Sequence, residues 1–173
     1  MQVRMIIRLL ILTLLVPSGV EVLQGQVIFP WDDLPPALRE AFGESPLAEV
    51  YDASDRINPL YLRGDFDGDG KVDYAILIKR KSDGKLGFAV WLSSRENPII
   101  LGAGSRVEYG ASLEDHLDFD SWRVSSPNRF DSSTSIEQPK GFRRDCIFVQ
   151  KGEDASGIFF FKAGKFHWLQ EGD

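Results

Sequence analysis

The chain has 173 residues, of which 43% are hydrophobic and 27% charged, as expected for a globular protein with one sizeable core. Its formal charge of −6 argues against a nucleic acid partner, because nucleic-acid-binding domains carry an excess of basic residues. The single cysteine, Cys146, excludes an internal disulfide, and it begins an apolar run, so we expect a buried thiol with no catalytic role.

The first 26 residues predict a secretory signal peptide. Arg4 and Arg8 precede an apolar stretch over residues 9–16, which is shorter than the about 20 residues of a membrane span. We place the cut between residues 18 and 26, with an uncleaved signal anchor as the alternative. The expected product is a secreted or periplasmic protein with no stable membrane span and a single β-rich domain over residues 27–173. Cleavage after residue 26 removes two arginines and one glutamate, so 20 basic and 26 acidic groups become 18 and 25, a charge of −7.

The segment from Phe29 to Phe42 predicts a short helix. Asp32 or Asp33 is the expected N-cap, and Leu38 and Phe42 would share one side of the helix. The pattern over residues 45–58 is weak and predicts no regular element.

Strand patterns begin at Pro59. A run over residues 74–78 is continuously apolar, which predicts a central strand covered on both faces. A turn at residues 82–85 joins it to a strand in which Phe88, Val90 and Leu92 face one side and Ala89 and Trp91 the other. The predicted strands of this half cover residues 59–63, 74–78, 87–94 and 98–102.

Residues 103–140 contain only scattered apolar side chains, such as Trp122, Val124 and Phe130, and predict long loops with one or two edge strands. Three further strands end the chain and form a meander with turns at residues 153–156 and 163–165. The expected fold is therefore an α+β, β-rich domain with a mainly antiparallel sheet. The three predicted C-terminal strands begin at residues 146, 157 and 166.

The stretch RGDFDGDGKVDYAILIK, residues 63–79, gathers four aspartates within nine positions. Calcium prefers six to eight oxygen ligands, so a loop that binds it must bring oxygens together from several positions. Asp65, Asp67 and Asp69 stand at positions 1, 3 and 5 of such a loop, and Asp73 stands at position 9. Without a cation these carboxylates would repel one another, so the spacing predicts a calcium site.

Two further positions fit the same loop. Gly70 at position 6 permits a sharp turn, and Lys71 at position 7 can offer its main-chain carbonyl. An EF-hand is excluded because its position 12 requires glutamate, and Ile76 stands there. Both flanks of the loop also read as strands, so we expect a strand-loop-strand calcium site.

These residues resemble the calcium loop of FG-GAP or VCBS repeats, which has the form D-x-D-x-D-G-x-x-D followed by apolar residues, and the similarity extends to Gly64 and Phe66. Such repeats usually form β-propellers in several copies, but this chain has a single copy and is too short for a propeller. The layout is also similar to that of small exported bacterial proteins. The metal ligands that the resemblance implies are Asp65, Asp67, Asp69, Asp73 and the carbonyl of Lys71.

Other sequence features have two readings each. Arg63, Gly64 and Asp65 spell an adhesion tripeptide, which we treat as coincidental because Asp65 is needed as a ligand. His116 lies among acidic residues that could form a second cation site or a hydrolytic centre, although a solvated loop is favoured. His167 is expected to face outward. The acidic residues near His116 are Glu114, Asp115, Asp118 and Asp120.

Five aromatic residues could form an exposed binding platform, but alternate positions on strands favour a place in the core. They are Trp91, Trp122, Phe159, Phe161 and Trp168.

No local signature of a serine, cysteine, zinc or phosphate-binding enzyme is present in the sequence. We therefore expect an exported, non-catalytic domain that binds Ca²⁺ structurally and recognises another protein or an envelope component. The alternatives are a secreted hydrolase that uses acidic residues and a periplasmic inhibitor-type protein.

Overall fold

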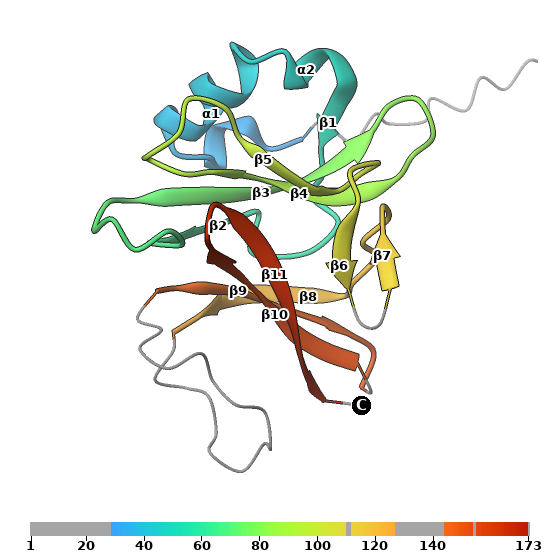
Figure 1. Ribbon diagram of the computed structural model, residues 1–173. Helices are drawn as coiled ribbons and strands as arrows, with labels where there is room; N and C mark the ends of the chain where they lie inside the picture. Colours follow the sequence, from blue (N-terminus) through green and yellow to red (C-terminus); the bar gives the residue numbers. More distant parts are fainter. Residues whose placement is uncertain (1–28, 110–111, 127–143, 154, 173) are drawn as a thin grey trace, which may run out of the picture.

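The computed structural model describes residues 29–109, 112–126, 144–153 and 155–172. Two antiparallel sheets face each other across a shared core, and helices cover the outer side of the first sheet (Figure 1). The chain is β-rich with little helix, as predicted. The predicted signal peptide and Phe130 lie outside the described residues. Within the described ranges, no helix has the length and apolar character needed to cross a membrane.

Three short helices precede the sheets: η1 (Trp31–Asp33), α1 (Pro36–Gly43) and α2 (Leu47–Val50). Leu38 and Phe42 are buried on the inner side of α1, as predicted. The predicted cap is wrong, because the N-cap of α1 is Pro35 and no side chain caps the helix. Pro36 at the first helical position already has the backbone angle that a helix needs, so the helix begins without an aspartate cap.

The first sheet contains β1 (Tyr51–Ala53), β2 (Tyr61–Gly64), β3 (Asp73–Arg80), β4 (Leu86–Trp91) and β5 (Ile99–Gly102). Strand β3 lies at its centre, with β1 and β2 along one side and β4 and then β5 on the other. Residues of β3 alternate between the two faces: Leu77 packs between the sheets and Ile76 packs beneath the helices. The predicted division of faces in β4 is confirmed.

A tight turn joins β3 to β4, as predicted. The Arg80 N–H donates to the Lys85 carbonyl, and Gly84 takes a φ of +73°, which favours glycine. The Arg80 guanidinium donates two hydrogen bonds to Asp83, and these bonds lower the pKa of the Asp83 carboxyl to about 2. This turn fixes the register of the hairpin, in which Tyr74 lies opposite Trp91.

The second sheet contains β8 (Ser121–Ser125), β9 (Cys146–Lys151), β10 (Ala155–Lys162) and β11 (Lys165–Gly172) in the order β11-β10-β9-β8. The predicted C-terminal meander is confirmed, although Ala155, Ser156 and Lys165 belong to strands and the turns are shorter than expected. Strands β6 (Val107–Tyr109) and β7 (Ser112–Glu114) form a separate ladder.

The described part of residues 103–140 therefore holds three strands, β6, β7 and β8, more than the one or two expected. Two of them, β6 and β7, have three residues each, too few for an alternating pattern to stand out in the sequence. Their position depends on packing instead. Val107 of β6 is buried in the core between the sheets, and Tyr109 lies with its ring 4.5 Å from the ring of Trp168.

The five aromatic residues listed above belong to the hydrophobic core. Trp122, Phe159 and Phe161 are buried, and Trp91 and Trp168 are half-buried against the same clusters. The Trp122 indole N–H donates to the Pro59 carbonyl at 2.7 Å, so its polar group is satisfied. These residues do not form an exposed platform.

We expect the Cys146 thiol to resist alkylation in the native protein. Its side chain is buried, and burial raises the pKa of the thiol to about 12, so very little reactive thiolate is present at pH 8. Mass spectrometry after treatment with iodoacetamide should find unmodified protein under native conditions and full modification in urea. Rapid modification of the folded protein would contradict this burial.

Candidate metal centre

The aspartate-rich segment connects β2 to β3 at one end of the first sheet. The two strands pair up to the edge of the loop, where Gly64 lies opposite Asp73, so the predicted strand-loop-strand arrangement is present. Phe66 is the anchor of the loop: its side chain is fully buried in the core between the sheets. Gly64 makes room for it, because a β-carbon there would lie 2.9 Å from the Phe66 ring.

Three of the four predicted carboxylates converge. Asp65, Asp67 and Asp73 each place one oxygen within 4.8 Å of the others. The Asp73 side chain is fully buried; burial raises the pKa of its carboxyl, and the neighbouring Asp67 carboxylate adds to the rise. A bound cation would offset both effects, because it stabilises the ionised form.

Asp73 also organises the backbone around it. One carboxylate oxygen accepts the N–H groups of Phe66 at 2.8 Å and Asp67 at 3.3 Å. The other oxygen accepts the N–H of Ser93 at 2.7 Å, from the segment after β4. Each carboxylate oxygen has two lone pairs, so the oxygen that bonds Ser93 keeps acceptor capacity for an ion.

Asp65 is the centre of the turn itself. Its two oxygens accept N–H groups of Gly68 at 2.7 Å and Gly70 at 3.0 Å, so the backbone curls around this carboxylate. Gly68 and Gly70 have φ values of +78° and +84°, which other residues adopt only with strain. Because its carboxylate is held inside the loop, Asp65 is not presented as part of an adhesion tripeptide.

Asp69 lies apart from the converging group. One of its oxygens accepts the Ser93 hydroxyl at 2.8 Å, and the other accepts the Lys71 N–H at 2.8 Å. These bonds, the Ser93 one first, lower the pKa of the Asp69 carboxyl. The Lys71 side chain is exposed and its ammonium lies 3.8 Å from the same carboxylate, so the part of Lys71 available to an ion is its main-chain carbonyl.

Two serines that the sequence reasoning did not include complete the surroundings of the loop. The Ser94 hydroxyl donates to Asp67, and Ser93 bonds both Asp69 and Asp73. The sequence contained a feature from which the position of these serines could have been predicted, namely the turn between β3 and β4. The turn at residues 82–85 sets the hairpin register, which places the residues just beyond Leu92 beside Asp73.

The loop is also tied to the second sheet, through residues that no local pattern indicated. Asp145 accepts the Asp65 N–H at 3.0 Å, and the Asp145 N–H donates to the Asp65 carbonyl at 3.0 Å. Arg144 lies against Gly68, where a β-carbon would be 2.6 Å from the Arg144 Nε atom, and donates to the Phe161 carbonyl. The loop therefore sits at the junction of the two sheets.

The acidic residues around His116 do not converge in this way. Lys85 pairs with Asp115 at 2.5 Å, and Lys151 pairs with Asp118 at 2.7 Å and Asp120 at 3.4 Å. The lysine hydrogen bonds lower the pKa of the Asp115 and Asp118 carboxyls, and the Gly152 N–H, with Lys151 second, lowers that of Asp120, whereas a catalytic acid needs a raised pKa.

The remaining groups of that region also have local partners. Glu114 accepts the Ser112 hydroxyl at 2.6 Å, and the exposed His116 ring accepts the Leu86 N–H at 3.0 Å through Nδ1. Within the described residues, the carboxylates of the β2–β3 loop are the only convergent set of potential metal ligands. The acidic residues around His116 are thus better described as a solvated acidic loop than as a second cation site.

His167, predicted to face outward, is half-buried and its ring stacks on Phe160.

Comparison with known protein families finds none whose model matches the chain, and no curated protein or solved structure is significantly similar to it. The chemical argument therefore rests on the site. Clustered carboxylates, hydroxyls and main-chain carbonyls are the hard oxygen ligands that Ca²⁺ takes, and no nitrogen or sulfur ligand lies in the group.

Proposed function

We propose that the chain is an exported, non-catalytic domain whose β2–β3 loop binds Ca²⁺ and which recognises another protein or an envelope component. The ligands are Asp65, Asp67, Asp69, Asp73 and the carbonyl of Lys71. The ion has a structural role, because it neutralises the loop where β2 and β3 meet. The observation that carries the proposal is the convergence of three carboxylates within 4.8 Å.

Two features of the loop support a cation at this place. The buried Asp73 carboxylate lies near Asp67, so a positive charge removes a repulsion that the fold otherwise bears. Asp69 is close by on the same loop and its bond to the Ser93 hydroxyl can be exchanged for a bond to the ion. A calcium shell of six to eight oxygens is then supplied by side chains, the Lys71 carbonyl and water.

The energetic effect is modest. Extracellular calcium modules have dissociation constants of about 0.1 to 1 mM, and a value of about 0.1 mM at about 1 mM calcium adds about 1.4 kcal/mol to the free energy of unfolding. For a domain of this size, that corresponds to an increase in melting temperature of about 4 °C. Calcium therefore stabilises the fold without deciding whether it forms.

We expect calcium to raise the melting temperature of the purified protein, and Asp67→Asn to abolish the increase. Asp67 is one of the three converging carboxylates, so its neutralisation removes ligand charge at the centre of the group. Differential scanning calorimetry in calcium and in EGTA measures the shift, and isothermal titration calorimetry measures the affinity.

Asp55→Asn is the matched control, because it makes the same chemical change at an exposed position outside the loop. The control should keep the full calcium response. Equal melting temperatures of the unmodified protein in calcium and EGTA, with no calcium bound after dialysis, would refute the calcium site.

A further inference from the structure

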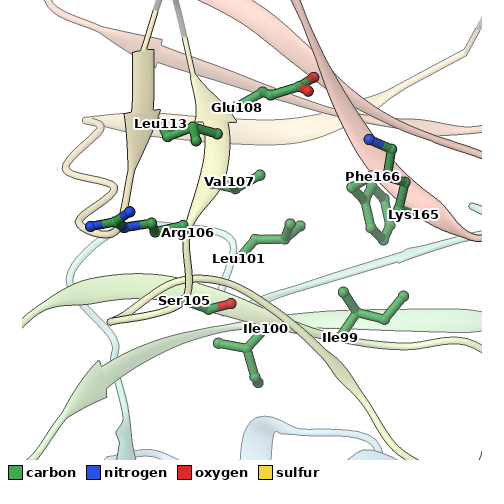
Figure 2. Close-up of a pocket in the computed structure, with 10 residues that line it drawn as sticks. All are labelled: Ile99, Ile100, Leu101, Ser105, Arg106, Val107, Glu108, Leu113, Lys165 and Phe166. Atoms are coloured by element: carbon green, nitrogen blue, oxygen red, sulfur yellow. The ribbon is translucent and has the colours of Figure 1, made fainter.

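A hollow of about 300 Å³ lies where β5 of the first sheet, the β6–β7 ladder and β11 of the second sheet meet. Figure 2 shows Ile99 and Leu101 of β5 at one wall, Phe166 of β11 at another, and Val107 of β6 across from Phe166. This volume lies at the lower end of the range of ligand pockets. Its walls continue the apolar core, since Leu101, Val107 and Phe166 belong to the core between the sheets.

Both the side chains and the backbone edges of strands line the hollow. Three consecutive residues of β5, Ile99, Ile100 and Leu101, line it, although the side chains of Ile100 and Leu101 point in opposite directions (Figure 2). Consecutive residues can border one space only if the backbone edge of the strand borders it too. Lys165 and Phe166, also consecutive, line it from β11.

Both of these strands end their sheets. Strand β5 is the last strand of the first sheet and β11 is the last of the second, so among the described residues no strand ladder covers their outer edges. The outer edge of a strand exposes backbone N–H and C=O groups that form hydrogen bonds with water. An alkyl chain in the hollow would remove that water without replacing the hydrogen bonds, and leaving these groups unpaired is unfavourable. An extended peptide replaces these hydrogen bonds, as in recognition by strand addition.

The charges at the opening indicate what kind of peptide fits. The Lys165 side chain lines the hollow and its ammonium has no ion-pair partner among the described residues, whereas Glu108 across the opening lies 3.8 Å from His167. In Figure 2 the Arg106 side chain extends away from Phe166 and Lys165. Among the described residues, the hollow thus has two cations without an ion-pair partner, Lys165 and Arg106, and one carboxylate, Glu108, whose contact with His167 is an ion pair only when the imidazole is protonated. The net charge of these three groups is positive, which an acidic side chain complements.

We propose that the hollow beside β5 binds an extended segment of a partner protein, which adds a short strand to β5, inserts an apolar side chain and presents an acidic side chain to Lys165. This supplies the surface for the partner recognition in the proposed function, and it does not depend on the calcium loop. The exposed Leu113 of β7, with 62% of its surface accessible, extends the apolar surface beside the hollow.

A library of random heptapeptides displayed on phage is the probe, selected on the immobilised full chain. The selected peptides should alternate apolar with polar residues and carry an acidic residue. Lys165→Glu should weaken their binding by about tenfold, because the charge at the opening is reversed. Lys79→Glu is the matched control: Lys79 is an exposed lysine on β3 that is not part of the hollow and does not pair with β11, so binding should be unchanged.

Hydrogen exchange measured by NMR tests the mode of binding. The β5 amides that point away from β4, such as that of Ile100, should gain protection when a selected peptide is added, whereas those of Ile99 and Leu101 point to β4. A version of the peptide with N-methylated backbone nitrogens should fail to bind. These results should be the same in calcium and in EGTA, so a failure of the calcium site leaves them unaffected.

Three outcomes would overturn the inference. One is a selection that enriches no peptides, and another is equal loss of binding in Lys79→Glu and Lys165→Glu. The third is a dimer of the chain, seen by analytical ultracentrifugation without peptide, in which the same β5 amides are protected, because a second copy would then be the occupant.

Discussion

Asp73→Ala is expected to lower the free energy of unfolding by about 3 kcal/mol, even when calcium is absent. The Asp73 carboxylate accepts three N–H groups, from Phe66, Asp67 and Ser93, and the side chain is fully buried. Alanine leaves these donors without an acceptor, which destabilises the fold by about 1 to 3 kcal/mol for each donor that water does not reach. Removal of the buried carboxylate charge offsets part of this destabilisation. Urea unfolding in EGTA, followed by tryptophan fluorescence, measures the change.

Asp69→Ala separates this structural effect from metal binding. Asp69 is exposed and its bonds are made at the surface, so its loss should cost less than about 1 kcal/mol in EGTA. Both variants should lose affinity for calcium, because both residues are proposed ligands. If Asp69→Ala and Asp73→Ala were equally destabilising in EGTA, Asp73 would not have the organising role that its hydrogen bonds indicate.

Phe66→Ala should destabilise the protein by about 3 to 5 kcal/mol, a large part of the stability of a typical domain. The Phe66 ring is fully buried between the sheets, so alanine leaves a cavity in the core. The same change removes the anchor of the β2–β3 loop, and calcium affinity should fall with it. Chemical denaturation and calorimetric titration measure the two effects.

Val72→Ala is the matched control for Phe66. It shortens an apolar side chain in the same loop, but Val72 is 39% exposed, and we expect a change within about 0.5 kcal/mol. Phe66→Leu should fall between the two, because leucine fills part of the space of the ring. A Phe66→Ala variant with unchanged stability would show that the loop does not depend on this anchor.

The part of the site that the sequence predicted is the part made of near neighbours in the chain. The positions of Asp65, Asp67 and Asp73 follow from ligand spacing within one loop, and three carboxylates do converge there. Asp145 could not be found in this way, since it stands 80 positions from Asp65 and follows no motif. The position of Ser93 was predictable in part. It is distant from the loop in sequence, but the hairpin turn that places it beside Asp73 can be recognised in the sequence.

The fold shows the same division between local and distant causes. The C-terminal meander and the faces of β4 were predictable, because alternation of apolar residues is a local pattern. The start of α1 was not, because the helix begins at Pro36 with Pro35 as its N-cap and has no aspartate cap. One or two strands were expected among residues 103–140, but the positions of β6 and β7 were not predicted, since packing of Val107 and Tyr109 against the core, and no alternation of their own, defines them.

The paired hydrogen bonds between Asp65 and Asp145 have a kinetic consequence. They join segments 80 residues apart, and such contacts form only after the intervening chain has been ordered. We therefore expect the loop to be completed late in folding, when the two sheets have come together. If the proposed ion binds there, we expect it to leave the rate of folding almost unchanged and to slow unfolding, which would lengthen the lifetime of the native state.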